Sequence, residues 1–147
     1  MNEEVKTVFH FNHFVLNKNL GDITQEESLK CPETGGNCIN WIAGHIIVTR
    51  DFLLEFLGQE KLCDAKIVEL YVQGSEPIRS DNAIEMSKLI KIYNESQVKI
   101  NKALEEKDYK EIPEMAKELA GFGFHEAYHV GQTGLLRSIL GKPAVIK

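Results

Sequence analysis

The sequence lacks the features that define several large classes of protein. Its only cysteines, Cys31, Cys38 and Cys63, form no C-x-x-C pair, and their odd number predicts free thiols in a reducing compartment. Every apolar run is far shorter than the roughly 20 residues of a membrane-spanning helix. The first residues are acidic where a signal peptide has basic ones. These absences predict a cytoplasmic protein that does not interact with a membrane.

Clustered positive charge is also missing. The formal net charge is −5, and the lysines are interspersed with acidic residues. A surface for nucleic acid or for an anionic membrane would need a basic patch, so neither partner is expected. The remaining composition is that of an ordinary globular protein, with 43% hydrophobic and 27% charged residues. A chain of this length predicts a single domain over residues 1–147.

Four segments have the apolar spacing of amphipathic helices. They span approximately residues 2–20, 37–57, 81–105 and 113–140. Gly21, Gly58 and Gly141 follow three of these segments, as expected for helix ends. Asn37 is a candidate N-cap for the second segment, and Asn82-x-x-Glu85 has the form of a capping box for the third. No segment shows convincing strand alternation, so the sequence predicts an all-α fold.

The number and length of these helices favour a four-helix bundle. The segment between the second and third helices, about residues 58–80, is long and contains the turn signal Gly74-Ser75-Glu76-Pro77. A connection of this length allows a crossover between helices two and three, and long loops in compact domains are often functional. We therefore expect this crossover to cover the mouth of a cavity.

Three of the five histidines lie on the inward stripes of two helices. His125 and His129 are one helical turn apart in the fourth helix, so their side chains share a face. His45 lies on the apolar stripe of the second helix. Bundles build metal sites from inward side chains of facing helices, and three histidines with an open fourth position are typical of catalytic zinc. Unrelated core histidines are the alternative interpretation.

The string His125-Glu126-Ala127-Tyr128-His129 also matches H-E-x-x-H, the signature of zinc proteases. Such proteases take a third ligand from further along the chain. Here Gln132 and Leu135 stand where the longer motif has glycine and histidine, and no acidic residue or histidine follows residue 130. The protease interpretation is therefore rejected, and the third ligand is expected upstream at His45.

Five polar or aromatic residues near these histidines have two readings each. Glu126 is either a partly solvated glutamate or the catalytic base for a metal-bound water. Gln132 shares the histidine face and either holds an imidazole N–H or lines the cavity. His13 and Asn12 on the first helix border the cavity or simply pack within the core. Trp41, one turn before His45, packs over the site or anchors its helix.

Four glycines, Gly121, Gly123, Gly131 and Gly134, interrupt the fourth helix. Each costs roughly 1 kcal/mol relative to alanine inside a helix. Their clustering predicts either a close approach of another helix or room beside the metal.

Two segments resemble a known family. NWIAGHIIVTRDFLLEFLG and FHEAYHVGQTGLLRSILGK are similar to the signature segments of the DinB-like superfamily, and GSEPI in the linker is similar too. The resemblance extends from Val5 to Lys142. It implies a four-helix bundle that holds a divalent ion, often zinc or nickel, on His45, His125 and His129. It also implies a homodimer.

The resemblance and the site lead to one expected activity and two alternatives. Related branches of the superfamily include thiol-dependent S-transferases and a mycothiol-dependent isomerase. An open position on the metal can bind water or a thiol sulfur and lower the pKa of either. We expect a metal-dependent enzyme that transfers a low-molecular-weight thiol to a small-molecule electrophile. The alternatives are a metal-dependent hydrolase and a non-catalytic metal-binding stress or scaffold protein.

Overall fold

The computed structural model describes residues 2–109 and 112–146, and within these ranges the chain forms helices and no strand. The predicted all-α class is therefore confirmed. The helices are α1 (Glu3–Leu20), α2 (Gln25–Ser28), α3 (Ile39–Phe56), α4 (Ala65–Tyr71), α5 (Met86–Glu106) and α6 (Pro113–Ile139). None of the helices in these ranges combines the length and the apolarity needed to cross a membrane.

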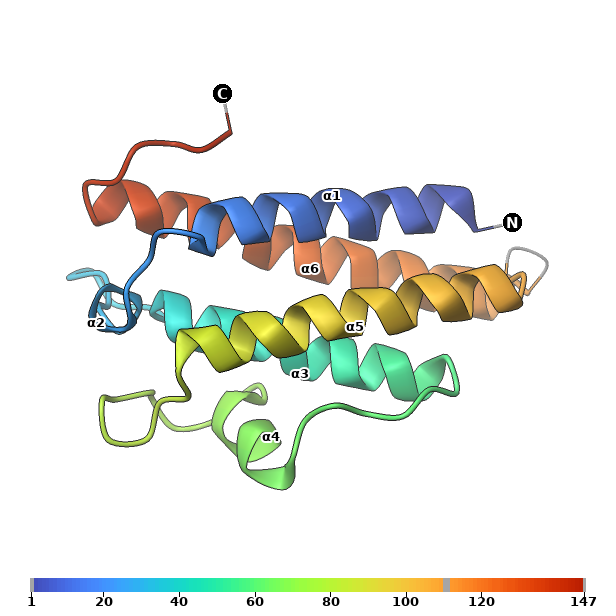
Figure 1. Cartoon of the computed structure of the whole chain (residues 1–147), viewed down its shortest axis with the longest axis horizontal. Coiled ribbons are helices and arrows are strands. Elements are labelled where there is room, and N and C mark those ends of the chain that lie inside the picture. The colour runs from blue at the N-terminus through green and yellow to red at the C-terminus, as the bar shows by residue number, and fades with distance from the viewer. Residues whose placement is uncertain (1, 110–111, 147) are drawn as a thin grey trace.

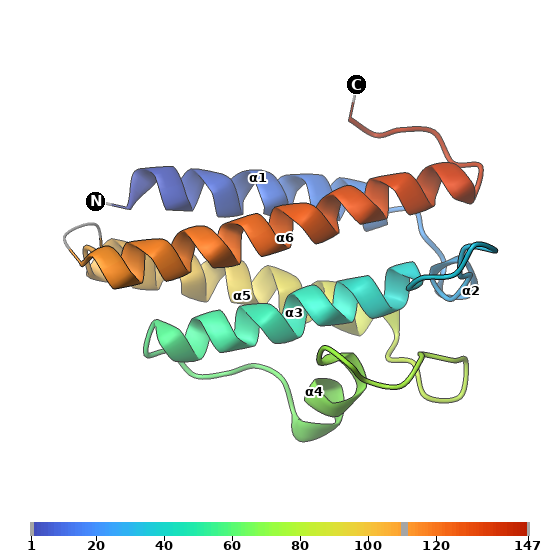
Figure 2. The same cartoon turned by 180° about the vertical axis from the view of Figure 1, so that it is seen from behind.

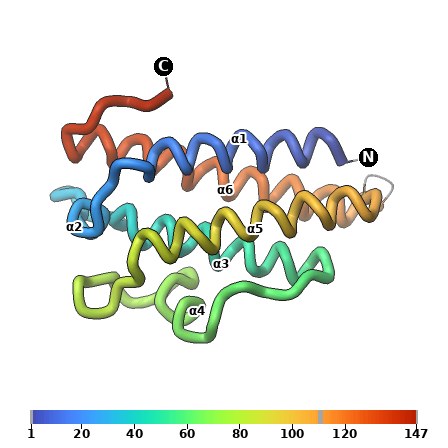
Figure 3. The backbone as a smooth tube through the Cα atoms, in the orientation of Figure 1, coloured from blue at the N-terminus to red at the C-terminus, as the bar shows by residue number. Residues whose placement is uncertain are grey.

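The four long helices lie side by side (Figures 1 and 2). Helices α1 and α6 run in one direction, whereas α3 and α5 run in the other (Figure 3). Each of α1 and α3 packs against both α5 and α6, and α4 packs against α3. Because α3 and α5 are parallel, the chain between them must return along the length of the molecule. It does so through α4, on the outer side of α3 (Figure 2).

The predicted boundaries agree with the structure for α1, α3 and α6. For α5, the predicted start was wrong. Helix α5 begins at Met86, and its N-cap Glu85 makes no side-chain cap hydrogen bond. The expected capping residue Asn82 instead accepts a hydrogen bond from the backbone N–H of Arg79, at 2.7 Å, and stabilises the preceding turn. Similarly, the N-cap of α3 is Cys38, not Asn37.

Two short helices were not predicted, and each has a local cap. Thr24 and Glu27 form a complete capping box at α2. The side chain of Asp64 accepts a hydrogen bond from the backbone N–H of Ile67 at the start of α4. Seven residues or fewer give too little periodicity for an amphipathic pattern to be read.

The most buried face of α6 differs in part from the one that the sequence spacing predicts. The predicted stripe consists of Met115, Leu119, Phe122, His125, His129, Gln132, Leu136 and Ile139. Leu119 and Leu136 are buried as predicted, whereas Ile139 is exposed, and the buried residues also include Glu126, Val130, Thr133 and Arg137. Helix α6 packs against both α1 and α3, so its covered sector is wide. Glu126 and Arg137 interrupt the apolar pattern on the innermost side of α6. The apolar spacing therefore predicted the neighbouring stripe, which carries the histidines.

Candidate metal centre

The structure brings His45 of α3 together with His125 and His129 of α6. Each histidine offers a ring nitrogen, and these atoms lie within 4.8 Å of one another. The Nε2 atoms of His45 and His125 are 3.2 Å apart. Two nitrogens at 2.0–2.1 Å from one tetrahedral zinc ion lie roughly 3.3 Å apart, so this pair has the spacing of two ligands to one ion.

Carbonyl oxygens orient two of the three rings. The Nδ1 atom of His45 lies 2.9 Å from the backbone oxygen of Tyr71, and the Nδ1 atom of His129 lies 2.8 Å from Oε1 of Gln132. A carbonyl oxygen only accepts, so Nδ1 carries the proton in both rings and Nε2 is left with its lone pair. Histidines that bind metals are held in this way by a partner on the other ring nitrogen.

His125 gives an independent test of whether a metal fits. Its Nδ1 atom is buried and has no hydrogen-bond partner among the described residues. Its Nε2 atom faces the Nε2 atom of His45, which has already been assigned a lone pair. Buried polar atoms normally have partners, and this pair of Nε2 atoms can be satisfied either by a proton on Nε2 of His125 or by a cation that both nitrogens bind. The donor set therefore fits a divalent ion.

Aromatic side chains cover two of the histidines. The ring of Trp41 stacks on His45, with centroids 4.7 Å apart and planes 11° apart. The indole N–H of Trp41 donates to Oγ of Ser75 at 3.0 Å, so the segment between α4 and α5 reaches the site. Tyr128 contacts the ring of His129 edge-on, at 5.2 Å. These rings place aromatic surface against His45 and His129.

Gly44 allows α4 to approach the site closely. A Cβ atom at this position would lie 2.2 Å from the ring of Tyr71, the residue whose carbonyl orients His45. Tyr71 is fully buried, and its hydroxyl donates to Oδ1 of Asn40 at 2.7 Å. The ring therefore cannot move aside without breaking other contacts.

Gly44→Ala is accordingly expected to displace Tyr71 and to free the Nδ1 atom of His45. Loss of a partner that orients a metal ligand typically lowers metal affinity about 10- to 100-fold. Isothermal titration with zinc would measure the change. Ala43→Gly alters the neighbouring position of the same helix without adding an atom near Tyr71, and is the control. Equal affinities for the wild type and Gly44→Ala would contradict this role for Tyr71.

Burial keeps the site histidines neutral at physiological pH. It lowers the pKa of His125 to about 4, with a further contribution from His129 and His45. It also lowers the pKa of His45 and of His129. A fourth histidine, His13, behaves in the same way, because burial and the nearby Arg50 lower its pKa to about 4. Neutral imidazole is the form that binds metals.

These shifts predict that the metal-free protein loses stability in mild acid. Histidine in an unfolded chain titrates near 6.5, so below that pH the unfolded state binds protons that the folded state excludes. The free energy of unfolding is therefore expected to be highest above pH 6.5 and to decrease as the pH is lowered toward about 4. Urea unfolding at pH 7.5 and pH 5 in the presence of a chelator measures the loss. His13→Phe keeps a ring against Tyr93 but removes one titrating histidine, so the loss of stability at pH 5 should be smaller. An unchanged loss would contradict the contribution of His13.

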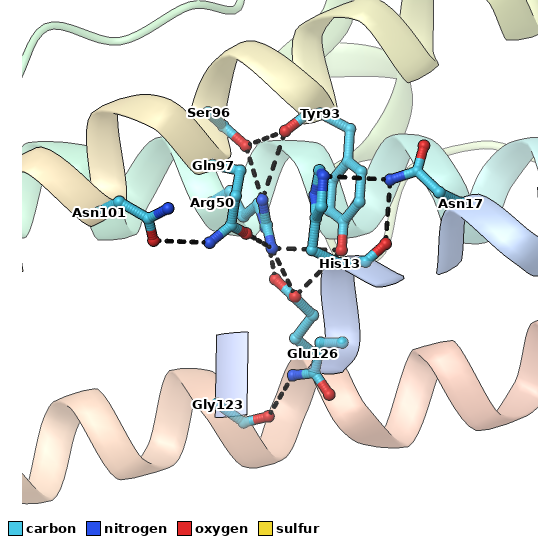
Figure 4. Close-up of polar contacts among 10 residues, drawn as sticks. His13, Asn17, Arg50, Tyr93, Ser96, Gln97, Asn101, Gly123 and Glu126 are labelled. Atoms are coloured by element: carbon cyan, nitrogen blue, oxygen red, sulfur yellow. Dashed lines mark hydrogen bonds and ion pairs between the residues drawn. The ribbon is translucent and has the colours of Figure 1, made fainter. Parts of the chain in front are cut away.

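A buried ion pair joins α3 to α6 and was not anticipated from the sequence (Figure 4). Arg50 of α3 and Glu126 of α6 have side chains that are only 1% and 3% exposed. The Nε and Nη2 atoms of Arg50 donate to the two carboxylate oxygens of Glu126 at 2.6 and 2.8 Å. The remaining guanidinium N–H groups donate to three residues of α5, namely Tyr93, Ser96 and Gln97.

The surroundings of Glu126 correct one expectation. Glu126 is buried, so the prediction that it is partly solvated was wrong. Its carboxylate accepts hydrogen bonds from Arg50 and from the hydroxyl of Tyr93. Its role as a catalytic base stays a prediction, but both oxygens are already engaged. Arg50 lies in a helix whose other buried residues are mostly apolar, so its burial requires a partner of opposite charge. That requirement is the signal by which the sequence could have indicated the pair.

His13 and Asn12 contact residues outside the histidine triad. His13 stacks on Tyr93, with ring centroids 5.0 Å apart, and its Nε2 atom lies 3.3 Å from Nδ2 of Asn17 (Figure 4). Asn12 is buried and donates to the backbone oxygen of Gly123 at 3.2 Å, which joins α1 to α6. Gln132 and Trp41, in contrast, contact His129 and His45 directly.

Comparison with known proteins adds no family assignment. No protein-family model matches the chain, and no curated protein or solved structure matches it significantly.

Proposed function

We propose that the protein is a metal-dependent enzyme that uses His45, His125 and His129 to hold a divalent ion and activates a low-molecular-weight thiol for transfer to an electrophile. The four long helices would then form a four-helix bundle of the DinB-like type, with the chain between α3 and α5 as its crossover. The free state of all three cysteines supports a reducing, cytoplasmic location.

The observation that carries this proposal is the convergence of three imidazoles, two of which are oriented by a carbonyl oxygen. His45 and His129 each have a carbonyl partner on Nδ1, and His45 and His125 have the Nε2 spacing of ligands to one ion. Three protein ligands leave a fourth position for an exogenous group, as in catalytic zinc sites. When bound, a zinc or nickel ion would supply Lewis acidity that lowers the pKa of a thiol at that position.

The side chains around the triad support thiol chemistry over hydrolysis. Trp41 and Tyr128 place aromatic surface against His45 and His129, and aromatic surface favours an apolar substrate over water. In zinc proteases with the H-E-x-x-H motif, a free glutamate acts as the general base for the metal-bound water. Glu126, the acid next to His125, directs both oxygens to Arg50 and Tyr93. A thiol has a much lower pKa than water before it binds the metal, so its deprotonation depends less on such a base.

Turnover assays can test this proposal directly. Protein reloaded with zinc or with nickel would be incubated with an electrophilic aryl halide or epoxide and a series of thiols, including glutathione, cysteine and longer thiol conjugates. The expected result is consumption of the electrophile that requires both metal and thiol and disappears in His125→Ala. Hydrolysis of ester substrates without thiol would favour the hydrolase alternative. Tight metal binding without any turnover would favour a structural ion.

A further inference from the structure

Two of the three cysteines stand at the ends of one loop, which connects α2 to α3 at one end of the molecule (Figure 1). Cys31 is exposed, Cys38 is buried, and most residues between them are exposed. The backbone N–H of Gly35 donates to the carbonyl oxygen of Pro32 at 3.0 Å, and Gly35 and Gly36 have φ angles of 89° and 112°. Glycine adopts such angles at no steric cost, so the chain can turn back here. The thiols of Cys31 and Cys38 are thereby brought into direct contact.

The cysteine at the start of α3 is not explained by helix capping. Cys38 is the N-cap residue of this helix, and its side chain makes no cap hydrogen bond. Serine, threonine, aspartate and asparagine are preferred at this position because their side-chain oxygen accepts a hydrogen bond from the first turn of the helix. The sulfur of a thiol is only a weak acceptor. The residue type at position 38 therefore requires another reason, and the contact with Cys31 supplies one.

The surroundings of the two thiols give them different roles. Burial raises the pKa of the Cys38 thiol, although the backbone N–H groups at the start of α3 oppose this rise. A buried, protonated thiol reacts poorly with dissolved reagents, whereas the exposed Cys31 can meet them. Cys31 is thus the thiol that reacts first, and Cys38 is placed to react with Cys31. Burial and the carboxylate of Asp51 raise the pKa of Cys63 to about 12, so this third thiol is expected to be inert.

A cleft beside Cys31 gives a small reagent access to its sulfur. The cleft has a volume of about 470 Å³ and lies between the α2–α3 loop and the C-terminal part of α6. Lys30 and Thr34 contribute polar groups to its lining, and Leu136 and Leu140 contribute apolar ones. Sites for small molecules have volumes in this range and combine apolar walls with a few polar groups. The ammonium of Lys30 and the hydroxyl of Thr34 suit a peptide-like molecule that carries carboxylate and amide groups.

We propose that Cys31 and Cys38 form a dithiol pair that a low-molecular-weight disulfide, such as oxidised glutathione, converts into an intramolecular disulfide. The thiolate of Cys31 attacks one sulfur of the reagent, whose S–S bond breaks, and the first small thiol leaves with the proton that Cys31 gave up. Cys38 then gives up its proton, attacks the sulfur of Cys31 and displaces the second small thiol.

The exchange is balanced by the reagent alone. One S–S bond breaks and one forms, and two electrons and two protons pass from the two cysteines to the small disulfide, which becomes two thiols. In a reducing compartment such a bond is transient and responds to the ratio of small disulfides to thiols. The pair includes none of the three converging histidines, so this inference does not depend on a bound metal ion.

Oxidised glutathione added to the reduced full chain tests the proposal, with acid quenching and mass spectrometry of the intact protein as the readout. The wild type is expected to lose the mass of two hydrogen atoms and to retain no glutathione. Cys38→Ser should instead retain one glutathione on Cys31, and serine is a preferred N-cap, so this variant should fold. Cys31→Ser should react at least roughly tenfold more slowly, because its remaining thiols are shielded by burial. Cys63→Ser is the matched control and should behave as the wild type does.

Peptide mapping locates the bond. Trypsin leaves Cys31 and Cys38 in one peptide, residues 31–50, which should resist alkylation after oxidation while Cys63 is alkylated. Cleavage after Glu33 should then give two peptides joined by a disulfide. A wild type that shows no change, that keeps glutathione on Cys31, or that forms its bond through Cys63 or between two chains overturns the proposal. Circular dichroism verifies the folding of each variant, and the mapping of the wild type alone carries the test if Cys38→Ser does not fold.

Discussion

Zinc affinity is expected to fall at least roughly 100-fold in each of the variants His45→Ala, His125→Ala and His129→Ala. Loss of a residue that only orients a ligand lowers affinity by up to about that factor, and loss of the ligand itself should cost no less. The wild type should bind about one ion per chain. The reason is geometric, since each substitution removes one of three nitrogens that converge within 4.8 Å. Competition with a chromophoric chelator after metal removal and reloading measures the affinities.

His10→Ala is the control for this series. His10 lies on the exposed side of α1 and is not among the three histidines whose nitrogens converge. Its substitution should leave the affinity unchanged. Thermal unfolding gives a second readout, because an ion at 100 times its dissociation constant stabilises the folded state by about 2.7 kcal/mol. Equal losses in all four variants, or a wild type that retains no ion after reloading, would contradict the assignment.

The sequence predicted the triad because its information is local and periodic. His125 and His129 are one turn apart, and His45 lies in the apolar stripe of another helix, so two patterns and one packing rule bring them together. The partners that orient the rings fall into two groups. Gln132 lies three residues from His129 and could be anticipated from the same helix face. The carbonyl of Tyr71 could not, since its position depends on α4 and on the tertiary approach that Gly44 permits.

Long-range polar pairing marks a different limit of sequence reasoning. Arg50 and Glu126 are 76 residues apart, and each interrupts an otherwise apolar helix face. Periodicity treats such residues as breaks in the stripe, so Glu126 was expected near solvent. Only their mutual neutralisation makes the burial of both possible, because an isolated charge in a protein interior is very costly. The innermost face of α6 was missed for the same reason.

Breaking this pair is expected to give the largest loss of stability of any single substitution considered for the chain. Glu126→Leu leaves the guanidinium of Arg50 buried without its counter-charge, and removal of one partner from a buried ion pair typically costs about 3–5 kcal/mol. Urea unfolding of the metal-free protein measures the change. Glu55→Leu is the matched control, because Glu55 pairs with Lys61 at 3.1 Å on the exposed surface, where such pairs contribute at most about 1 kcal/mol.

The double variant Arg50→Met/Glu126→Leu separates stability from position. Replacing a whole buried ion pair with apolar side chains of similar volume is often neutral for stability, so most of the loss in Glu126→Leu should be recovered.

The pair also joins α3 to α6 through two hydrogen bonds and α3 to α5 through Tyr93, Ser96 and Gln97. Its directional bonds fix how α3 lies along α6, and that alignment sets the 3.2 Å between the Nε2 atoms of His45 and His125. Recovered stability together with weakened zinc binding would show that the pair acts by aligning the two helices. A Glu126→Leu protein within 1 kcal/mol of the wild type would instead mean that Arg50 finds another partner or reaches solvent.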